Sequence, residues 1–525
     1  MSRSRSLLLL TTLIPLTTLL ASCGADDIAS PGTGGDVIIN PPAPTPPAPP
    51  PPPPPPATVT PASGCPTIAD PQGLTDSGTI TGPTGTWRVC SLPTRINRSI
   101  QLTKIPGLLY RLAGRTDVGT DGGPTASAAD SNVTLTIDPG VIVFGGSGVS
   151  WLAVNRGNKI QAVGTATQPI IFTSQDNVRG LNTDASSGQW GGVVLLGRAP
   201  ITDCENPGAA PGTTACERQT EGAADPAKYG GATVNDNSGR MSYVQIRYSG
   251  FVLSGNSELQ SLTTSGTGTG TQLDHIMSFN SSDDGAEFFG GRVNMKYFVS
   301  IGAEDDNLDT DVGVKGNFQY VLAVQRNGFG DAMIEADSDN AADGNTPRQN
   351  VRVSNATFIQ RSNTGSDLAA ILLRGGTDYT LANSVLVSSG LTCLRISRAN
   401  TIQAADPAQD EAGPPVFRSV QMTCGTPKYL GANGVTDAQV ASIFGSGTNN
   451  NNDAYVSTLT SIFVNGATEA AVPAFDATTI DAFFDRTTYI GAVRDATDNW
   501  YKGWTCNSAT ADLGGTGLCT TIPTS

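Results

Sequence analysis

The stretch MSYVQIRY at residues 241–248 is the first of six apolar runs that decide the fold of this chain. The runs are rich in β-branched and aromatic residues, and Gly, Asn, Asp and Ser separate them. They recur at intervals of about 20 to 30 residues, the repeat length of a solenoid in which each coil supplies one strand to each face. The other five are QLDHIM (272–277), VNMKYFV (293–299), NFQYVLAV (317–324), VRVSNATFI (351–359) and YTLANSVLV (379–387).

Shorter runs of the same kind precede residue 241, among them VTLTI (133–137), PIIFT (169–173) and GVVLL (192–196). We therefore predict an all-β protein, a right-handed parallel β-helix over residues 131–424. Alternate apolar side chains would fill a narrow core. An antiparallel sandwich or propeller is the alternative, but hairpin signals such as Asn-Gly between strands are scarce.

A solenoid must cover the two open ends of its core. We expect residues 58–130 to form an N-terminal cap and residues 425–525 a C-terminal cap. The pattern changes in the latter segment, where 436–444 and 478–484 are typical of short helices.

Several motifs carry a family resemblance that covers roughly residues 130–505. The chain resembles large bacterial surface proteins of the pectate-lyase-like β-helix group, which are exported, often lipoproteins, and mostly of unknown function. The resemblance implies the fold and a surface location, but this fold hosts lyases, hydrolases, adhesins and inert stalks. The motifs are LTIDPG (135–140), PIIFTS (169–174), WGGVVLLG (190–197), SSDDGAEFFGG (281–291) and YIGAV (489–493).

The N-terminus is typical of an export signal, with Arg3 and Arg5 before an apolar run at 7–20. This run is too short to cross a bilayer, which takes about 20 apolar residues. The sequence LASCG at 20–24 resembles the bacterial lipobox, which implies that residues 1–22 are removed and that Cys23 carries covalent lipid. Several acyl chains anchor a protein stably without a spanning helix. We expect an outer-membrane lipoprotein that is exposed at the surface.

Residues 23–57 would link the lipid to the folded part. Between Pro41 and Pro56, 13 of 16 residues are proline. Such a run favours polyproline II at ~3.1 Å per residue, so it alone could span roughly 50 Å. We interpret it as a stalk that holds the domain away from the membrane.

The charge balance is acidic. Removal of Arg3 and Arg5 leaves 31−2 = 29 Lys and Arg against 46 Asp and Glu, a formal net charge of −17. This balance excludes nucleic-acid binding through phosphate neutralisation, and it fits divalent cations or cationic partners.

Eight cysteines remain once Cys23 carries lipid. An even number at short spacings in an exported protein predicts local disulfides, and spacings of 25, 12, 31 and 13 do not resemble those of zinc ligands. The predicted pairs are Cys65 with Cys90, Cys204 with Cys216, Cys393 with Cys424, and Cys506 with Cys519.

Acidic residues cluster after three successive predicted strands. The offsets from Asp284 to Asp306 (306−284 = 22) and from Asp306 to Asp331 (331−306 = 25) match one coil each. Coils of that length would stack these carboxylates about 5 Å apart on one face. Stacked carboxylates repel one another and favour Ca²⁺, which takes six to eight oxygen ligands. The candidate Ca²⁺ ligands are Asp284, Asp305, Asp306, Asp309 and Asp331.

Three other interpretations of this cluster remain open. Two of Asp283, Asp284, Asp306 and Asp331 could serve as acid and base in glycoside hydrolysis, which needs carboxyl groups about 5 to 9.5 Å apart. A polysaccharide lyase would need a base beside a bound cation. Asp side chains could also simply accept backbone amides at the coil corners. The candidate lyase bases are Arg292, Lys296, Lys315 and Arg326.

The resemblance to β-helix polygalacturonases is incomplete. Asp283-Asp284-Gly285 looks like their paired-aspartate motif. Their Gly-His-Gly motif is absent, and Arg395-Ile396-Ser397 lacks the lysine of their Arg-Ile-Lys motif. This departure weakens the hydrolase interpretation.

The single histidine limits the chemistry. His275 lies within a predicted strand, so we expect it to be packed or to point outward. The aromatic residues Trp151, Trp190, Phe288, Phe289 and Phe329 could stack on sugar rings or fill the core. We therefore expect a non-enzymatic surface protein that binds polysaccharide or an envelope protein and is stabilised by Ca²⁺. The alternative is a lyase or hydrolase that acts on acidic polysaccharide.

Overall fold

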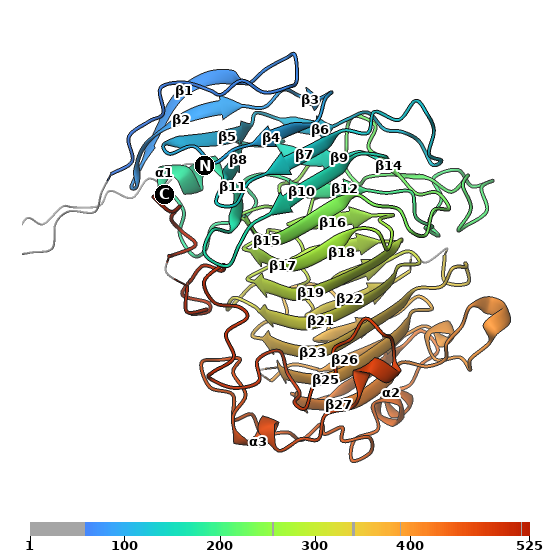
Figure 1. The fold of residues 1–525 in the computed structure, drawn as a ribbon. Coiled ribbons are helices and arrows are strands. Elements are labelled where there is room, and N and C mark those ends of the chain that lie inside the picture. The colour runs from blue at the N-terminus through green and yellow to red at the C-terminus, as the bar shows by residue number, and fades with distance from the viewer. Residues whose placement is uncertain (1–57, 255–256, 339–341, 389, 516, 525) are drawn as a thin grey trace, which may run out of the picture. The chain divides into compact units, whose positions relative to one another are not determined.

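The computed structural model describes residues 58–525, except 255–256, 339–341, 389, 516 and 525. The chain folds as an all-β parallel β-helix (Figure 1), as the spacing of the apolar runs predicts. The predicted signal peptide (1–22), the lipid site at Cys23 and the stalk (23–57) lie outside the described residues and stay predictions.

The first sheet has 15 strands, and its neighbouring strands are parallel except for β1 and β2. Its strands from β15 to β25 are long and correspond to the six apolar runs of the sequence. The strands are β1 (Thr75–Gly82), β2 (Gly85–Ser91), β4 (Ile100–Leu102), β5 (Leu108–Leu112), β7 (Thr134–Ile137), β8 (Ile142–Gly145), β10 (Lys159–Val163), β11 (Ile170–Ser174), β15 (Gly239–Arg247), β17 (Gln272–Phe279), β19 (Arg292–Ile301), β21 (Lys315–Val324), β23 (Asn350–Gln360), β25 (Asp378–Ser388) and β27 (Val416–Thr423).

The second sheet has 11 strands, all parallel to their neighbours. These strands are short, with two to five residues each. They are β3 (Arg95–Ile96), β6 (Arg115–Val118), β9 (Trp151–Val154), β12 (Gly192–Leu196), β16 (Leu262–Ser265), β18 (Ala286–Phe289), β20 (Asp309–Asp311), β22 (Ile334–Asp337), β24 (Ile371–Leu373), β26 (Leu394–Ser397) and β28 (Tyr429–Ala432).

Each long strand bends at one residue with positive φ, so the first sheet covers two faces of the helix. In β15 the bend lies at Tyr243, with β10 pairing before it and β11 after it. The same conformation recurs at the corresponding position of the later long strands. Aromatic side chains stack along this corner, with ring centroids 4.2 Å apart for Tyr243 and His275, 4.3 Å for His275 and Tyr297, and 4.7 Å for Tyr297 and Tyr320. Stacking of this kind offsets part of the strain of a left-handed backbone.

Alternating side chains fill the interior between the faces. Phe172, Ile276, Phe298 and Phe358 are fully buried there, with Phe288 of the second sheet against Phe318 of the first. Each such side chain contributes about 1.5–3 kcal/mol by leaving water. The described residues from 58 onward form one compact unit around this continuous column of apolar contacts.

At the N-terminal end, the hairpin β1–β2 lies over the first coil. The parallel pairing already begins with β2 and β5, ahead of the predicted boundary at residue 131. At the other end it continues through β28, past residue 424. The sequence pattern misses these coils because their strands are short and Pro and Gly interrupt them.

Beyond β28, the helix α2 (Asp437–Phe444) packs against β27 and β28 and covers the last coil. This helix confirms the prediction for 436–444, and Thr436 caps it in a capping box with Gln439. The segment 478–484 differs from its prediction, because its regular part is a single 3₁₀ turn at Ala477–Thr479. The remaining elements are α1 (Gln175–Arg179), α3 (Ala467–Ala470), the 3₁₀ turns Ala399–Thr401 and Pro407–Gln409, and the hairpin β13 (Arg218–Gln219) and β14 (Lys228–Tyr229).

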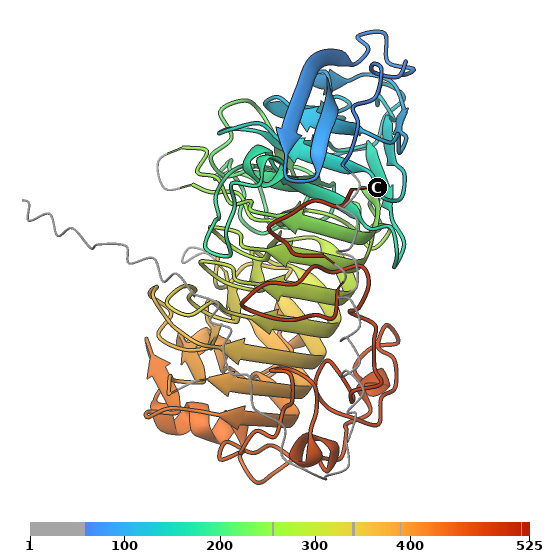
Figure 2. The same ribbon diagram turned by 90° about the vertical axis from the view of Figure 1, so that its left-hand side faces the viewer.

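Residues 457–523, apart from 516, form a C-terminal strap that runs back along the first sheet toward the N-terminal end (Figure 2). Amide side chains of the β-helix hold its backbone in reverse chain order, first at the bends of β25 and β23 and then in β15 and α1. Phe475 bonds to Asn383, Tyr489 to Asn355, Trp504 to Gln245 and Cys519 to Asn177. Most of the predicted cap at 425–525 therefore covers a long face of the helix and not its end.

The eight cysteines form the four predicted disulfides: Cys65–Cys90, Cys204–Cys216, Cys393–Cys424 and Cys506–Cys519. Each closes a loop of 12 to 31 residues. Among the described residues, no helix is long and apolar enough to span a bilayer.

Candidate functional site

Carboxylates gather on the outer side of the second sheet, where three strands lie in register. Glu287 of β18, Asp309 of β20 and Glu335 of β22 occupy neighbouring positions of one column. Their neighbours in the chain, Phe288 and Ala336, point into the core. Because side chains alternate along a strand, the acids must face outward.

Further acidic residues lie beside this column. Some lie at the corner before one of the three strands and some lie two residues further along these strands. One more lies in the coil that follows. We call the whole set the acidic ladder. It comprises Asp283, Asp284, Glu287, Asp305, Asp306, Asp309, Asp311, Glu335, Asp337 and Asp367.

Corner aspartates hold the backbone of the next coil. Asp284 accepts a hydrogen bond from the backbone N–H of Asp306 at 2.9 Å, and Asp306 accepts one from Ala332 at 2.5 Å. The Asp331 carboxylate accepts the N–H groups of Ser366 and Asp367. These aspartates therefore accept backbone amides at the coil corners, and the hydrogen bonds connect each coil to the next.

Carboxylate oxygens of the ladder also converge in three groups, each with all its oxygens within 4.8 Å of one another. Two oxygens on opposite sides of a Ca²⁺ ion, each about 2.4 Å from it, lie about 4.8 Å apart. The spacing therefore suits a shared cation. The groups are Asp283–Asp284–Asp305, Asp284–Glu287–Asp309 and Asp306–Glu335–Asp367.

The middle group is the most enclosed. Asp284 is 5 % exposed, and Glu287 and Asp309 are each 7 % exposed. Burial and, after it, the neighbouring carboxylates raise the pKa of all three well above the usual range. The same two causes raise the pKa of Asp283 to about 8. Without a cation, such a group holds protons at neutral pH.

Positive charge in the ladder is scarce. Arg374 bonds to Glu335 and to Asp337, both at 2.7 Å, and it is the one cation within the described residues in ion-pair contact with the ladder. Buried oxygens of Asp311, Asp337 and Asp367 have no hydrogen-bond donor in the described part of the chain. Buried carboxylates without a partner cost several kcal/mol each, so the ladder requires protons or metal ions.

A cavity of about 370 Å³ opens beside the ladder. The hairpin β13–β14 lines it, directly after the loop that the disulfide Cys204–Cys216 closes. Glu287, Asp311 and Phe289 line it from the second sheet, and Arg218 and Tyr229 from the hairpin. A space of this size next to carboxyl groups of raised pKa suits a small polar ligand.

The predicted cation ligands are only partly brought together. Asp284 lies with Asp305 in one group and with Asp309 in another, whereas Asp306 belongs to the third. Asp331 belongs to none of them. The coil from Asp309 to Glu335 has 335−309 = 26 residues, so Asp306 aligns with Ala332 and not with Asp331. This one-residue difference turns the Asp331 carboxylate to the amides of the following coil.

The sequence-based site lacked Glu287, Asp311, Glu335, Asp337, Asp367 and Arg374. The 22-residue offset that links Asp284 to Asp306 also links Glu287 to Asp309, so this pair could have been found. Asp367 and Arg374 lie in the coil after that of Glu335. Paired residues of these two coils are 371−334 = 37 positions apart, which no regular offset predicts.

The candidate lyase bases are engaged elsewhere. Lys296 pairs with Asp485, Lys315 with Asp410 and Arg326 with Glu304. Arg292 donates to the carbonyl oxygens of Gly291 and Gly313. None of these four cations contacts the acidic ladder in the described structure.

His275 and most of the aromatic candidates have structural positions. His275 stacks between Tyr243 and Tyr297 and bonds to Asp274 at 2.7 Å. Trp151, Trp190 and Phe288 are buried, whereas Phe289 is half-buried at the cavity and Phe329 is exposed. Phe289 is thus the aromatic candidate placed to contact a ligand at the ladder.

A family model for a pectate-lyase-like β-helix domain matches residues 124–505. No curated protein and no solved structure matches the chain.

Proposed function

The chain belongs to the pectate-lyase-like β-helix family, and from this premise we propose a surface protein of the cell envelope that binds Ca²⁺ through its acidic ladder. Lipid on Cys23 anchors it to the outer membrane, and the proline-rich segment holds the β-helix away from the lipid. The β-helix acts as a binding or structural protein toward polysaccharide or another envelope protein.

The observation that carries the Ca²⁺ proposal is the excess of buried carboxylates over cations. Three groups of converging oxygens share Arg374 as their one ion-pair partner within the described residues. Ca²⁺ accepts many carboxylate ligands in flexible geometry, whereas Mg²⁺ keeps most of its water. The oxygens of each group come from two or three successive coils, so an ion would link these coils.

Calcium would then stabilise the native helix by mass action. An ion that binds the native state and not the unfolded chain adds about 4 kcal/mol at a thousand times its Kd. Extracellular Ca²⁺ sites commonly work at roughly 0.1–1 mM.

Lys296, Lys315 and Arg326 each form an ion pair with an acid outside the ladder, which favours a binding role over a lyase. A lyase needs a basic group at the carbon that loses its proton, beside the bound cation. The cavity at Glu287 and Asp311 favours the alternative, a carbohydrate-active enzyme, because a carboxyl group of raised pKa can act as a general acid.

Calcium titration of the full chain tests the proposal. Differential scanning calorimetry should give a higher Tm in Ca²⁺ than in EDTA. In Glu287→Gln, the affinity should fall at least about tenfold, because one charged ligand is lost. In EDTA at pH 8, this variant should be as stable as the wild type or more so, because a buried repulsion is removed. Asp225→Asn, at an exposed position that belongs neither to the acidic ladder nor to the lining of its cavity, is the matched control.

An equal Tm in Ca²⁺ and EDTA would refute the Ca²⁺ proposal. Release of products from acidic polysaccharides, measured in the same samples, decides between the two functions. Turnover that Glu287→Gln or Asp284→Asn abolishes would establish the enzyme.

A further inference from the structure

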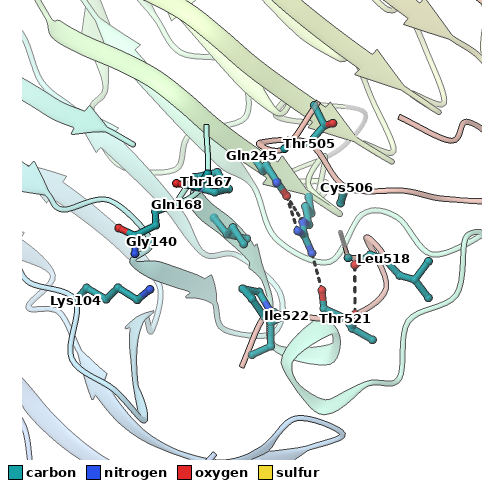
Figure 3. A pocket seen from close by; sticks show the side chains of 16 residues that line it. Lys104, Gly140, Thr167, Gln168, Gln245, Thr505, Cys506, Leu518, Thr521 and Ile522 are labelled. Atoms are coloured by element: carbon teal, nitrogen blue, oxygen red, sulfur yellow. Dashed lines mark hydrogen bonds between the residues drawn. The ribbon is translucent and has the colours of Figure 1, made fainter. Parts of the chain in front are cut away.

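A second cavity, of about 250 Å³, lies on the opposite part of the fold, between the first sheet and the C-terminal strap (Figure 3). Lys104 and Gln168 line it from the early coils, Gln245 and Arg247 from β15, and Thr505 and Thr521 from the strap. In an acidic chain, two cations and no carboxylate among the lining residues are an unusual combination.

Arg247 is the buried charge of this cavity. It is 3 % exposed, and burial lowers its pKa to about 10. Neither Arg247 nor Lys104 forms an ion pair with a carboxylate in the described chain. Neutral groups hold the guanidinium instead. Its Nε donates to Gln245, and its Nη1 donates to the carbonyl oxygens of Cys519 and Thr521 at 3.0 and 2.8 Å.

One guanidinium donor is left over. A guanidinium has five N–H groups, and Nε, Nη1 and one N–H of Nη2 account for four of them. The second Nη2 hydrogen has no acceptor among the described residues. A buried cation with a spare donor favours an anion in the adjoining space.

Lys104 supplies a second positive charge from across the cavity. Its ammonium group packs over Gly140, where a β-carbon would lie 2.9 Å from Nζ. Figure 3 shows the Lys104 side chain extended along the cavity, with Gln168 beside it. The amides of Gln168 and Gln245 and the hydroxyl groups of Thr505 and Thr521 provide neutral hydrogen-bonding groups, while Ile171 and Ile522 give one side an apolar surface.

From this arrangement we infer that the cavity under the strap binds a small molecule carrying an oxyanion, a carboxylate or a phosphate group. Arg247 and Lys104 contact the anion, and the surrounding amides and hydroxyl groups contact the rest of the molecule. The volume exceeds that of a free phosphate ion, so it also suits an acidic monosaccharide. The site is separate from the acidic ladder, and its ligand has the opposite charge.

Isothermal titration calorimetry on the full chain tests the inference, with inorganic phosphate, D-glucuronate and neutral D-glucose as separate probes. EDTA is present throughout, so that Ca²⁺ at the ladder cannot capture an anion. At least one of the two anions should bind, and glucose should bind at least about tenfold more weakly. Binding of phosphate identifies a free oxyanion as sufficient, whereas binding of glucuronate alone identifies a sugar acid.

Lys104→Gln should weaken anion binding at least about tenfold, because one charge-assisted contact is lost. The side chain is half-buried at the cavity, so the fold should tolerate the change. Lys159→Gln removes the same charge from an exposed position outside the cavity and should leave the affinity unchanged. Absence of anion binding, equal binding of glucose, or equal effects of the two variants would overturn the inference.

Discussion

Without calcium, the stability of this protein should fall as the pH rises from 6 to 8, and the Asp283 carboxyl group should contribute a defined share of that fall. Burial and the neighbouring Asp305 raise the Asp283 pKa from 3.8 to about 8. The native state therefore keeps a proton that the unfolded chain has already lost. The stabilisation is complete below pH 4 and is lost as the pH passes through the native pKa.

The magnitude follows from the width of the pH window. The native pKa of Asp283 lies two units above pH 6, and each unit adds 1.36 kcal/mol to the free energy of unfolding. At pH 8 about half of the native molecules have lost the proton, so the loss between pH 6 and pH 8 is about 2 kcal/mol. The unfolding entropy of a chain of this length is about 1 kcal/mol per kelvin, so Asp283 alone should lower Tm by about 2 °C.

Scanning calorimetry in EDTA at several pH values between 6 and 8 measures this slope. Asp283→Asn should reduce the fall by about 2 kcal/mol, because the amide has no proton to lose and can keep the contact with Gln260. Asp225→Asn, at an exposed site, should retain it. In saturating Ca²⁺ the slope should vanish or reverse, because the ion favours the charged carboxylates. A flat curve for the calcium-free wild type, or a slope that Asp283→Asn leaves unchanged, would refute the reasoning.

Two further predictions concern the strap and the anchor. Trp504→Ala should destabilise the protein by about 3–5 kcal/mol, because this fully buried side chain packs the strap against the first sheet, and limited proteolysis should then cut the strap first. An uncut strap would mean that the coils hold it without Trp504. Cys23→Ala should abolish labelling with radioactive palmitate and release the protein from the membrane fraction, with Cys65→Ala as a control that keeps the label. Protease treatment of intact cells should digest the wild type, and full protection would place the domain on the inner side of the membrane.

Much of the fold could be predicted because β-helix coils repeat their chemistry. Apolar runs at 241–387 recur once per coil, and each became a long strand of the first sheet. The cysteines pair with their nearest partners, because each bridge closes a short loop. The acidic cluster was also visible, because corner aspartates recur at the coil spacing.

The candidate site was harder to predict, because a carboxylate's neighbours depend on register to within one residue. Asp331 lies one position from where its offset placed it, and this difference moves it from the cation groups to the backbone of the next coil. Glu335 and Asp367 enter the ladder through coils of 26 and 37 residues, whose extra length lies in loops that carry no periodic signal.

The sequence by itself determined the repeating coil, the disulfide pairs and the acidic character of one face, because these features arise from residues close in the chain or from a regular period. Only the tertiary structure decided which carboxylates converge, where the scarce cations lie, and that the C-terminal segment runs back over the coils it follows. Those contacts join residues up to several hundred positions apart, as Asn177 and Cys519 do, and no local pattern specifies such pairs. They depend on how the coils stack and on which outer surfaces are left to be covered.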